Sequence, residues 1–205
     1  MKRTNKSKTR NFFRLVREHK NNPNFIKQEL IKLLPQEDVD VNTQEYKDHT
    51  LLHLAVRYDD AELIHLFVEY GVNINIASQT GESPLHYAVL RNKQIAVRSL
   101  LLLGADVNAS ASFEQTPLHY AIEHRRHLIA SLLIDAGAAI DMADENGQTP
   151  LHYATHQSDE AAIRLLLVAG ANPMIEDYDG ASVCGLIETR NDASLLQLLK
   201  EFNYE

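Results

Sequence analysis

The stretch Thr149-Pro150-Leu151-His152-Tyr153-Ala154 decides the fold, because near copies of it recur along the chain. Residues 83–88 read SPLHYA, residues 116–121 read TPLHYA, and residues 50–55 give the looser TLLHLA. The histidines of these stretches follow one another at steps of 33 residues: His53, His86, His119 and His152. Four glycines keep the same step: Gly71, Gly104, Gly137 and Gly170. Two independent markers with one period indicate an array of structural repeats.

This motif on a period of 33 residues resembles the ankyrin-repeat family. The end of the repeat is similar as well, since residues 104–108 read GADVN, as in the family, and looser versions begin at Gly71, Gly137 and Gly170. The resemblance extends over about residues 24–205. It implies an all-α solenoid of stacked helix-turn-helix units that hairpin-like turns connect.

The period divides the chain into a single repeat domain over residues 11–205, behind a disordered basic tail at residues 1–10. We expect an N-terminal cap unit over 11–44, full repeats over 45–77, 78–110, 111–143 and 144–176, and a C-terminal cap over 177–205. Each repeat should contain a polar turn, a short helix that opens at Thr/Ser-Pro, and a longer apolar helix that ends at the period glycine. The spacing of apolar residues predicts one buried stripe on each longer helix: Ile64, Phe67 and Val68; Val97, Leu100 and Leu101; Ala130, Leu133 and Ile134; Ile163, Leu166 and Leu167.

Charge and cysteine content narrow the functional classes. The net charge is −8, yet residues 1–20 hold eight Lys or Arg against one acid, so residues 21–205 carry −15. An acidic array disfavours nucleic-acid binding along its length. No apolar run is long enough for a membrane span, and the N-terminus lacks the apolar region of a signal peptide. The single cysteine, Cys184, fits a reducing compartment, so we expect an intracellular protein, cytoplasmic or nuclear.

No residues gather in the pattern of an active site. The repeat histidines should lie about 10 Å apart, too far to share a zinc ion. The family resemblance implies that each bonds the motif threonine and nearby backbone. His124 and His127 flank two arginines, which disfavours a metal, and Cys184 takes the place of a buried motif leucine. Since phosphate loops, paired cysteines and nucleophile elbows are also missing, we expect no enzyme activity, cofactor or metal.

The resemblance implies a concave binding surface that turn tips and short helices form. Carried over by position, the candidate turn-tip residues are Tyr46, Lys47, His49, Gln79, Thr80, Glu82, Ser112, Phe113, Gln115, Glu145, Asn146, Gln148 and Tyr178. The candidate short-helix residues are Arg57, Tyr58, Leu90, Arg91, Glu123, His124, His156 and Gln157. Aromatic residues and arginine anchor many interfaces, so we expect the partner on the N-terminal half of this surface.

The function that follows is a non-enzymatic protein–protein interaction module, an adaptor, scaffold or inhibitor that acts as a monomer and has no transmembrane segment. Two alternatives stay open. The basic residues 1–10 would serve nuclear import, nucleic acid or an anionic membrane, which would make the chain a localisation factor. The chain would otherwise be a secreted bacterial effector that binds a host protein in the host cytosol.

The chain departs from the family between the two helices of a repeat. The usual glycine is replaced there by Asp59, Asn92, Arg125 and Ser158. Arginine tolerates a left-handed backbone poorly. The third repeat also has Ala111 and Glu114 in place of the aspartate and glycine of its turn. These departures predict that the third repeat is the least regular and opens most readily.

Overall fold

The computed structural model describes residues 14, 18, 22–33, 42 and 50–204. The chain forms two compact units, residues 1–105 (unit 1) and residues 106–205 (unit 2). In the described residues the regular secondary structure is helical, with one isolated antiparallel bridge between Glu176 and Ser182. The predicted all-α class is therefore confirmed.

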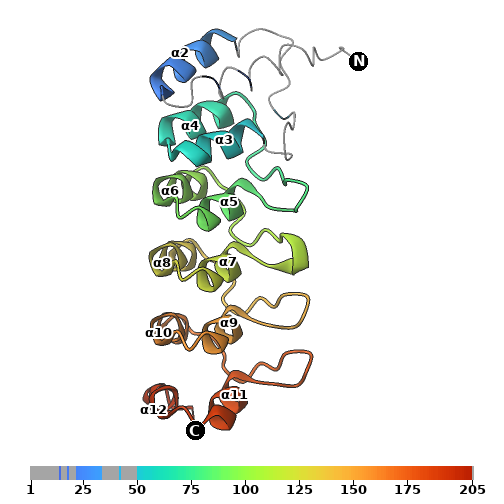
Figure 1. Cartoon of the computed structure of the whole chain (residues 1–205), viewed down its shortest axis with the longest axis vertical. Helices are drawn as coiled ribbons and strands as arrows, with labels where there is room; N and C mark the ends of the chain where they lie inside the picture. The colour runs from blue at the N-terminus through green and yellow to red at the C-terminus, as the bar shows by residue number, and fades with distance from the viewer. Residues whose placement is uncertain (1–13, 15–17, 19–21, 34–41, 43–49, 205) are drawn as a thin grey trace. The chain divides into compact units, whose positions relative to one another are not determined.

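The described part of unit 1 contains helix α2 (Pro23–Leu33) and two helix pairs. The pairs are α3 (Leu51–Tyr58) with α4 (Ala61–Glu69), and α5 (Pro84–Leu90) with α6 (Gln94–Leu102). Helix α3 packs on α5 and α4 packs on α6, as Figure 1 shows. An ion pair between Lys27 and Glu62 joins α2 to α4. Of the N-terminal cap expected over residues 11–44, the structure describes α2 and residues 14, 18, 22 and 42, and the rest lies outside the described residues.

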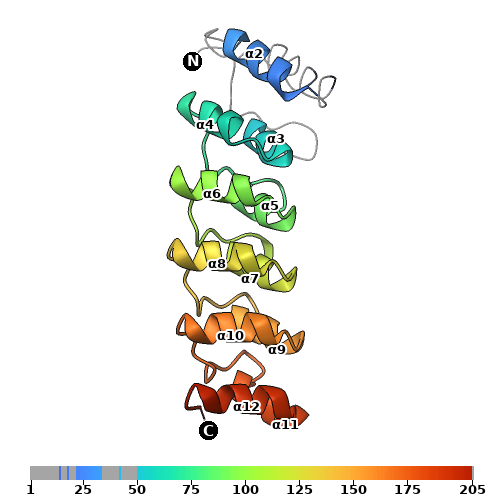
Figure 2. The same ribbon diagram turned by 90° about the vertical axis from the view of Figure 1, so that its left-hand side faces the viewer.

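Unit 2 contains a short 3₁₀ turn, η2 (Ser112–Glu114), and three helix pairs. These are α7 (Pro117–Glu123) with α8 (His127–Asp135), α9 (Pro150–His156) with α10 (Glu160–Val168), and α11 (Val183–Arg190) with α12 (Ala193–Glu201). Figures 1 and 2 show the pairs stacked, with α7, α9 and α11 next to the loops and α8, α10 and α12 on the other side. Stacking of this kind buries an apolar face that no pair could bury alone.

The motif histidine caps the start of the first helix in four of the helix pairs: α3, α5, α7 and α9. In α7, Thr116 N donates to His119 Nδ1 at 3.1 Å, and His119 N donates to Thr116 Oγ1 at 3.4 Å. Because Nδ1 accepts, the proton lies on Nε2, which donates to Gln148 O in the next loop at 3.0 Å. Equivalent Nε2 bonds reach Glu82 O from His53 and Ala181 O from His152. The structural role implied by the resemblance is confirmed, and His53, His119 and His152 each join their helix to the following loop.

Burial determines the charge state of this histidine. Burial lowers the pKa of His119, while its hydrogen bond to Gln148 O and the charge of Asp144 act in the opposite direction. The net effect lowers the pKa, so the imidazole is neutral at pH 7. A neutral ring with one donor and one acceptor is what the two bonds of His119 require.

The second helices begin and end in a regular way. Asp60, Asp159 and Asp192 cap α4, α10 and α12 by accepting from backbone N–H groups of the first turn. Lys93 precedes helix α6 without a side-chain cap bond, and Asp59 of the preceding pair accepts from Ala96 N at 2.8 Å. The four period glycines have φ between 82° and 93°, which confirms the predicted left-handed helix ends: Gly71, Gly104, Gly137 and Gly170.

The predicted apolar stripes are confirmed in two of their three positions. Residues at the first two positions have exposed fractions of 0–1%, as in Ile64 and Phe67 of α4 or Ile163 and Leu166 of α10. The prediction is wrong for the third position of three helices, because Val68, Leu101 and Ile134 are only half-buried. That position lies at the edge of a stripe about 100° wide, where neighbouring helices cover it incompletely. Leu167, at 5% exposed, is the buried exception.

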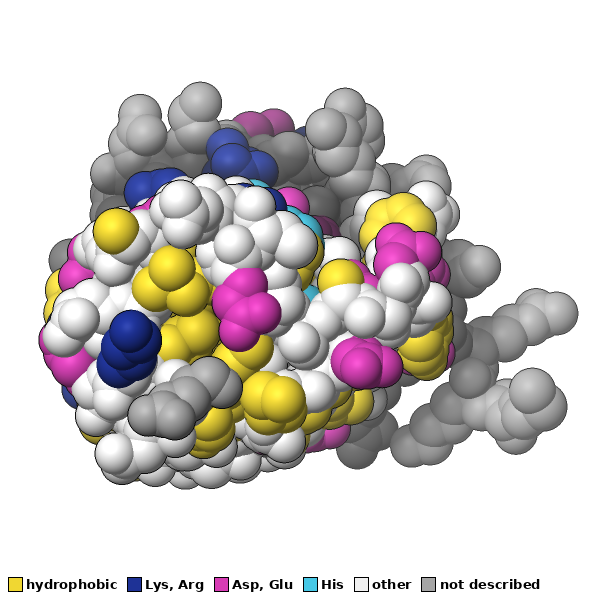
Figure 3. Space-filling model, turned by 90° about the horizontal axis from the view of Figure 1, so that it is seen from below, with side chains coloured by type: hydrophobic (Ala, Val, Ile, Leu, Met, Phe, Trp, Pro, Cys, Tyr) yellow, Lys and Arg dark blue, Asp and Glu magenta, His cyan; other side chains and the backbone are white. Residues whose placement is uncertain are grey.

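The end of unit 2 combines polar and apolar side chains. Gln197, Lys200 and Glu201 of α12 are exposed, as suits the polar outer face of a capping layer. Figure 3, seen from this end, also shows apolar side chains between the charged ones. Leu186, Leu196 and Phe202 are half-buried. In the described part of the chain, no helix has both the length and the apolar character to cross a membrane.

Candidate functional site

Two of the three loops of unit 2 end in a tight hairpin that a buried aspartate stabilises, Asp144 in one and Asp177 in the other. Asp144 N donates to Gln148 O at 2.9 Å, and Asp144 Oδ1 accepts from Asn146 N and Gln148 N, each at 2.9 Å. Asp177 Oδ1 accepts in the same way from Asp179 N at 3.0 Å and Ala181 N at 2.9 Å. Both aspartates are buried, so their charges hold the turn rather than face solvent. Burial raises the pKa of Asp177, but these hydrogen bonds outweigh it and the pKa is lowered.

Backbone hydrogen bonds connect the tips of successive loops. Glu145 N donates to Phe113 O at 3.0 Å, and Tyr178 N donates to Asn146 O at 3.0 Å. The three tips of unit 2 therefore form one continuous edge, which we call the tip surface: residues 112–114, 145–146 and 178–179. A ladder of backbone bonds fixes the spacing of the side chains that project from it.

Two aromatic side chains project from the tip surface. Phe113 is 62% exposed and Tyr178 is 79% exposed. Phe113 and its neighbour Glu114 both have left-handed backbones, with φ of 61° and 57°. The corresponding turns contain a glycine, such as Gly147 with φ 76°. A bulky residue in this conformation is an uncommon feature that marks functional sites more often than ordinary turns.

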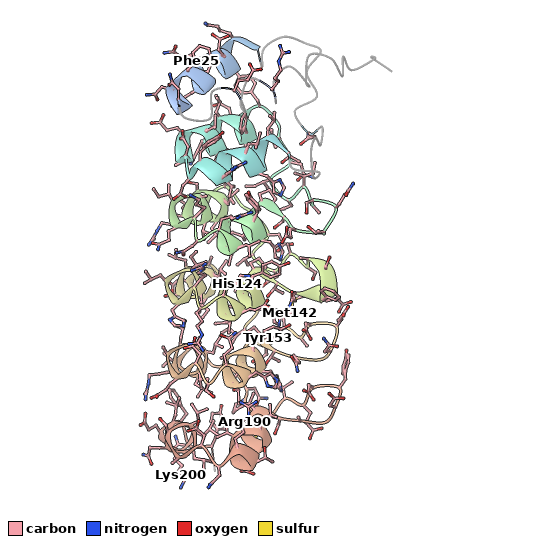
Figure 4. All side chains as sticks on the ribbon, viewed as in Figure 1. Phe25, His124, Met142, Tyr153, Arg190 and Lys200 are labelled. Carbon is pink, nitrogen blue, oxygen red and sulfur yellow. The ribbon has the colours of Figure 1, made fainter. Side chains whose placement is uncertain are left out.

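Below the tips, side-chain hydrogen bonds connect two successive loops of unit 2 through a tyrosine of helix α9. Gln115 Nε2 donates to Tyr153 Oη at 2.6 Å, and Tyr153 Oη donates to Asp144 Oδ2 at 2.7 Å (Figure 4). Burial and the bond to Asp144 raise the pKa of Tyr153, so its hydroxyl stays protonated and can keep donating. These hydrogen bonds consequently hold the residues below the tips in fixed positions.

The C-terminal ends of the first helices form a second row of polar groups. Arg125 Nε donates to Gln157 Oε1 at 3.1 Å and Arg125 Nη2 donates to Gln157 O at 2.9 Å. Gln157 Nε2 donates back to Glu123 O at 3.0 Å. These reciprocal bonds compensate for the left-handed backbone of Arg125, whose φ is 54°. Arg125 therefore takes the same left-handed backbone as Asp59, Asn92 and Ser158, and its side chain bonds to the next layer.

Arg190, the last residue of α11, bonds backward to the end of α9. Its Nη1 donates to Thr155 O at 2.7 Å, and its Nη2 donates to His156 Nδ1 at 3.2 Å (Figure 4). Burial, followed by the charges of Arg190 and His152, lowers the pKa of His156. His156 is thus an exposed, neutral imidazole at pH 7 beside a fixed guanidinium.

The remaining candidates of unit 2 differ in exposure. Glu123 and Glu145 are exposed, whereas Gln115, His124 and Gln148 are half-buried. His124 makes an edge-on ring contact with Tyr120, with centroids 6.2 Å apart. Of these five, the two acids present the most side chain to a partner.

The candidates of unit 1 follow a similar division. Arg57, Arg91, Gln79 and Thr80 are exposed, while Tyr58, Glu82 and Leu90 are half-buried. The Arg91 guanidinium lies over the ring of Tyr87, 5.3 Å from its centroid. Burial raises the pKa of Tyr58, and Arg57 opposes that effect. Tyr46, Lys47 and His49 lie outside the described residues.

Site residues that were not among the candidates from the sequence include Asp144, Tyr153 and Arg190. The sequence held a signal for Asp144. Asp144 stands three residues before Gly147, as Asp177 stands before Gly180, and this spacing marks an aspartate that holds its own turn. Tyr153 is part of the motif, but the motif does not indicate that its hydroxyl reaches back to the preceding loop.

Two features of the described residues bear on chemistry: the metal-ligating side chains and the cysteine thiol. No group of three His, Cys, Asp or Glu side chains gathers there in a way that would hold a metal ion. Cys184 is buried, and burial, together with Glu188, raises the pKa of its thiol. A protonated, buried thiol is a poor nucleophile.

Comparison with known families agrees with this geometry. The family model described as ankyrin repeats (3 copies) matches residues 19–111 and 96–177. The chain therefore belongs to the ankyrin-repeat family, whose members generally mediate protein–protein interaction. Among proteins with curated descriptions, none matches the chain.

Proposed function

We propose that this chain is a non-enzymatic adaptor or inhibitor that binds a protein partner through the turn tips and the ends of its first helices. The observation that carries the proposal is the tip surface, where Phe113 and Tyr178 are exposed on loops that backbone bonds and buried aspartates hold in place. Exposed aromatics are costly to leave in water and are common anchors of interfaces.

The mechanism would be that of a preformed surface. Because the tips and the row at Arg125, Gln157 and Arg190 are already ordered by hydrogen bonds, binding would cost little conformational entropy. A partner seated there would be blocked from other contacts or positioned for them. We assign the chain to the inside of the cell, in cytoplasm, nucleus or the cytosol of a host, because its single buried thiol suits a reducing compartment. We also propose that it acts as a monomer and that its repeats follow the boundaries expected above.

The experiment is a quantitative pull-down from lysate, analysed by mass spectrometry, with three forms of the full chain. The tip variant carries Phe113→Gly, Glu123→Ala and Glu145→Ala. A control variant carries Leu128→Ser and Val168→Ser on the second helices, where those side chains are 69% and 71% exposed. Circular dichroism must first show equal helix content in all three.

We expect one set of proteins to be retained by wild type and control and lost by the tip variant. Loss of the same proteins from the control instead would move the site to the second helices. A fourth form, lacking residues 1–10, tests the alternative that the basic tail carries the function. Loss confined to that form would replace the proposal.

A further inference from the structure

The loops of unit 2 have an unusual charge composition. Residues 106–116, 139–149 and 172–182 contain eight Asp or Glu and no Lys, Arg or His. Asp144 and Asp177 hold their hairpins from within, and Asp141 accepts from Asn172 N at 3.0 Å. The exposed acids of the tip surface are Glu114, Glu145 and Asp179. Within the described residues these three carboxylates form no ion pair.

The exposed acids lie beside the exposed aromatics. Glu114 follows Phe113 directly, and Glu145 N bonds to Phe113 O. Asp179 follows Tyr178, whose N bonds to Asn146 O. Each ring therefore stands next to at least one carboxylate on a fixed backbone. A flat cation that stacks on the ring face and bonds the carboxylate would use both groups at once.

We propose that the tip surface binds an extended, arginine-rich segment of a protein partner. This inference rests on the proposed protein-binding function and adds the chemistry of the partner. Arginine fits better than lysine, because a guanidinium stacks on aromatic rings and bonds carboxylates through two N–H groups. An acidic surface without basic side chains repels acidic segments and attracts basic ones, which supplies the charge complementarity.

The spacing of the tips limits the length of the segment. Phe113 and Tyr178 belong to loops two repeats apart, and neighbouring helix layers pack about 10 Å apart, so the two rings are separated by about 20 Å. An extended chain advances about 3.4 Å per residue, so about six residues span both rings. Side chains at alternate positions point to one side of such a chain, so two arginines six positions apart, with others between them, would reach Phe113 and Tyr178 from the same side.

The test uses fluorescence anisotropy with the full chain and a fluorescein-labelled eight-residue peptide in which arginine alternates with serine. Two matched peptides replace arginine by lysine or by citrulline, which is neutral and has nearly the same shape. We expect the arginine peptide to bind at least about threefold more tightly than the lysine peptide, the citrulline peptide not to bind, and added salt to weaken binding. Equal affinity for arginine and lysine peptides, or no binding of the arginine peptide, would overturn the proposal.

Variants separate the tip surface from general acidity. One variant carries Glu114→Gln, Glu145→Gln and Asp179→Asn, and a control removes the same charge elsewhere in unit 2 with Asp135→Asn, Glu188→Gln and Glu201→Gln, all at exposed positions. We expect the dissociation constant to rise about tenfold or more in the first variant and less than about twofold in the control. Phe113→Leu, which keeps the apolar area without the ring, should raise it about threefold. If the dissociation constant rises equally in the variant with the three tip substitutions and in the control, only the overall negative charge of the chain attracts the peptide, and the proposal is refuted.

Two further outcomes are decisive. If removal of residues 1–10 strengthens peptide binding, the chain's own basic segment occupies the tip surface, and the assignment to a partner is wrong. If the pull-down variant with Phe113→Gly, Glu123→Ala and Glu145→Ala still loses proteins that wild type retains, while the arginine peptide neither binds nor competes, the proposed protein-binding function stands and this inference fails. If neither assay depends on the tips, both fail.

Discussion

Replacing Gly147 by alanine should test whether the tips of unit 2 are fastened together as described. Gly147 has φ 76°, and a Cβ placed on it would lie 2.8 Å from Tyr178 Cδ1 and 2.9 Å from Tyr178 N. Gly180 is the matched control, because it has φ 78° at the corresponding turn position and nothing within 4 Å of its Cβ. Both substitutions place alanine in a left-handed backbone, and only one meets a neighbour.

The magnitudes follow from these contacts. A left-handed alanine costs roughly 1–2 kcal/mol, which should be the whole loss for Gly180→Ala. The exposed ring of Tyr178 can swing away from a new methyl group, but its backbone N cannot move without giving up its bond to Asn146 O. Loss of one hydrogen bond adds about 0.5–1.5 kcal/mol, so Gly147→Ala should cost about 2–3 kcal/mol in free energy of unfolding.

The assay is urea unfolding followed by circular dichroism, with the unfolding slope compared between variants. An unchanged slope means that the shift in midpoint reports stability alone. If Gly147→Ala costs no more than Gly180→Ala, Tyr178 N is not held over Gly147, and the tip surface is not the continuous edge described above.

Three more predictions concern neighbouring features. Phe113→Gly should raise the free energy of unfolding by about 1 kcal/mol in urea titrations while it weakens partner binding, because glycine relieves the left-handed strain at φ 61°; a destabilised variant would contradict this. Arg125→Ala should remove two hydrogen bonds to Gln157, at a cost of about 0.5–1.5 kcal/mol each. Amide hydrogen exchange should then become faster in α7 and α8 relative to α9 and α10. Uniform exchange would argue against the predicted weakness of the third repeat. Burial raises the pKa of Asp159, but hydrogen bonds, that from His127 first, outweigh it and lower the pKa. The unfolded chain then takes up this proton first, so wild-type stability should fall as pH drops below about 4 and the fall should be shallower in Asp159→Asn; identical acid limbs in urea titrations would refute the assignment.

Sequence reasoning predicts the repeat framework well, because the framework depends on local rules. The period glycines lie where a left-handed helix end is needed, and the motif histidine bonds residues only three positions away. The left-handed positions at Asp59, Asn92, Arg125 and Ser158 were likewise expected, and their φ values of 50–58° agree. Each of these features follows from a few neighbouring residues.

The site is less predictable, because it depends on contacts between repeats. From the sequence Asp144 and Glu145 are two adjacent acids, yet one is buried in its turn and the other faces solvent. Tyr153 reaches a residue nine positions earlier, and Arg125 reaches one 32 positions later. Composition shows that the loops are acidic, but only the three-dimensional arrangement shows which carboxylates remain for a partner.

The histidine bond also gives the stack a direction. His53, His119 and His152 each donate from Nε2 to a carbonyl 29 residues further along the chain, so a layer is completed by the loop that follows it. Removing the last layer with its loop would leave the imidazole of His152 without its acceptor, whereas removing the first layer would leave the histidine bonds of the later layers intact. In α11, Gly185 stands at the histidine position and its N donates to Ser182 Oγ, so that layer needs no carbonyl acceptor from a following loop. The repeats of this chain are therefore similar units with a fixed direction. Removing a repeat from the N-terminal end should not have the same effect as removing one from the C-terminal end.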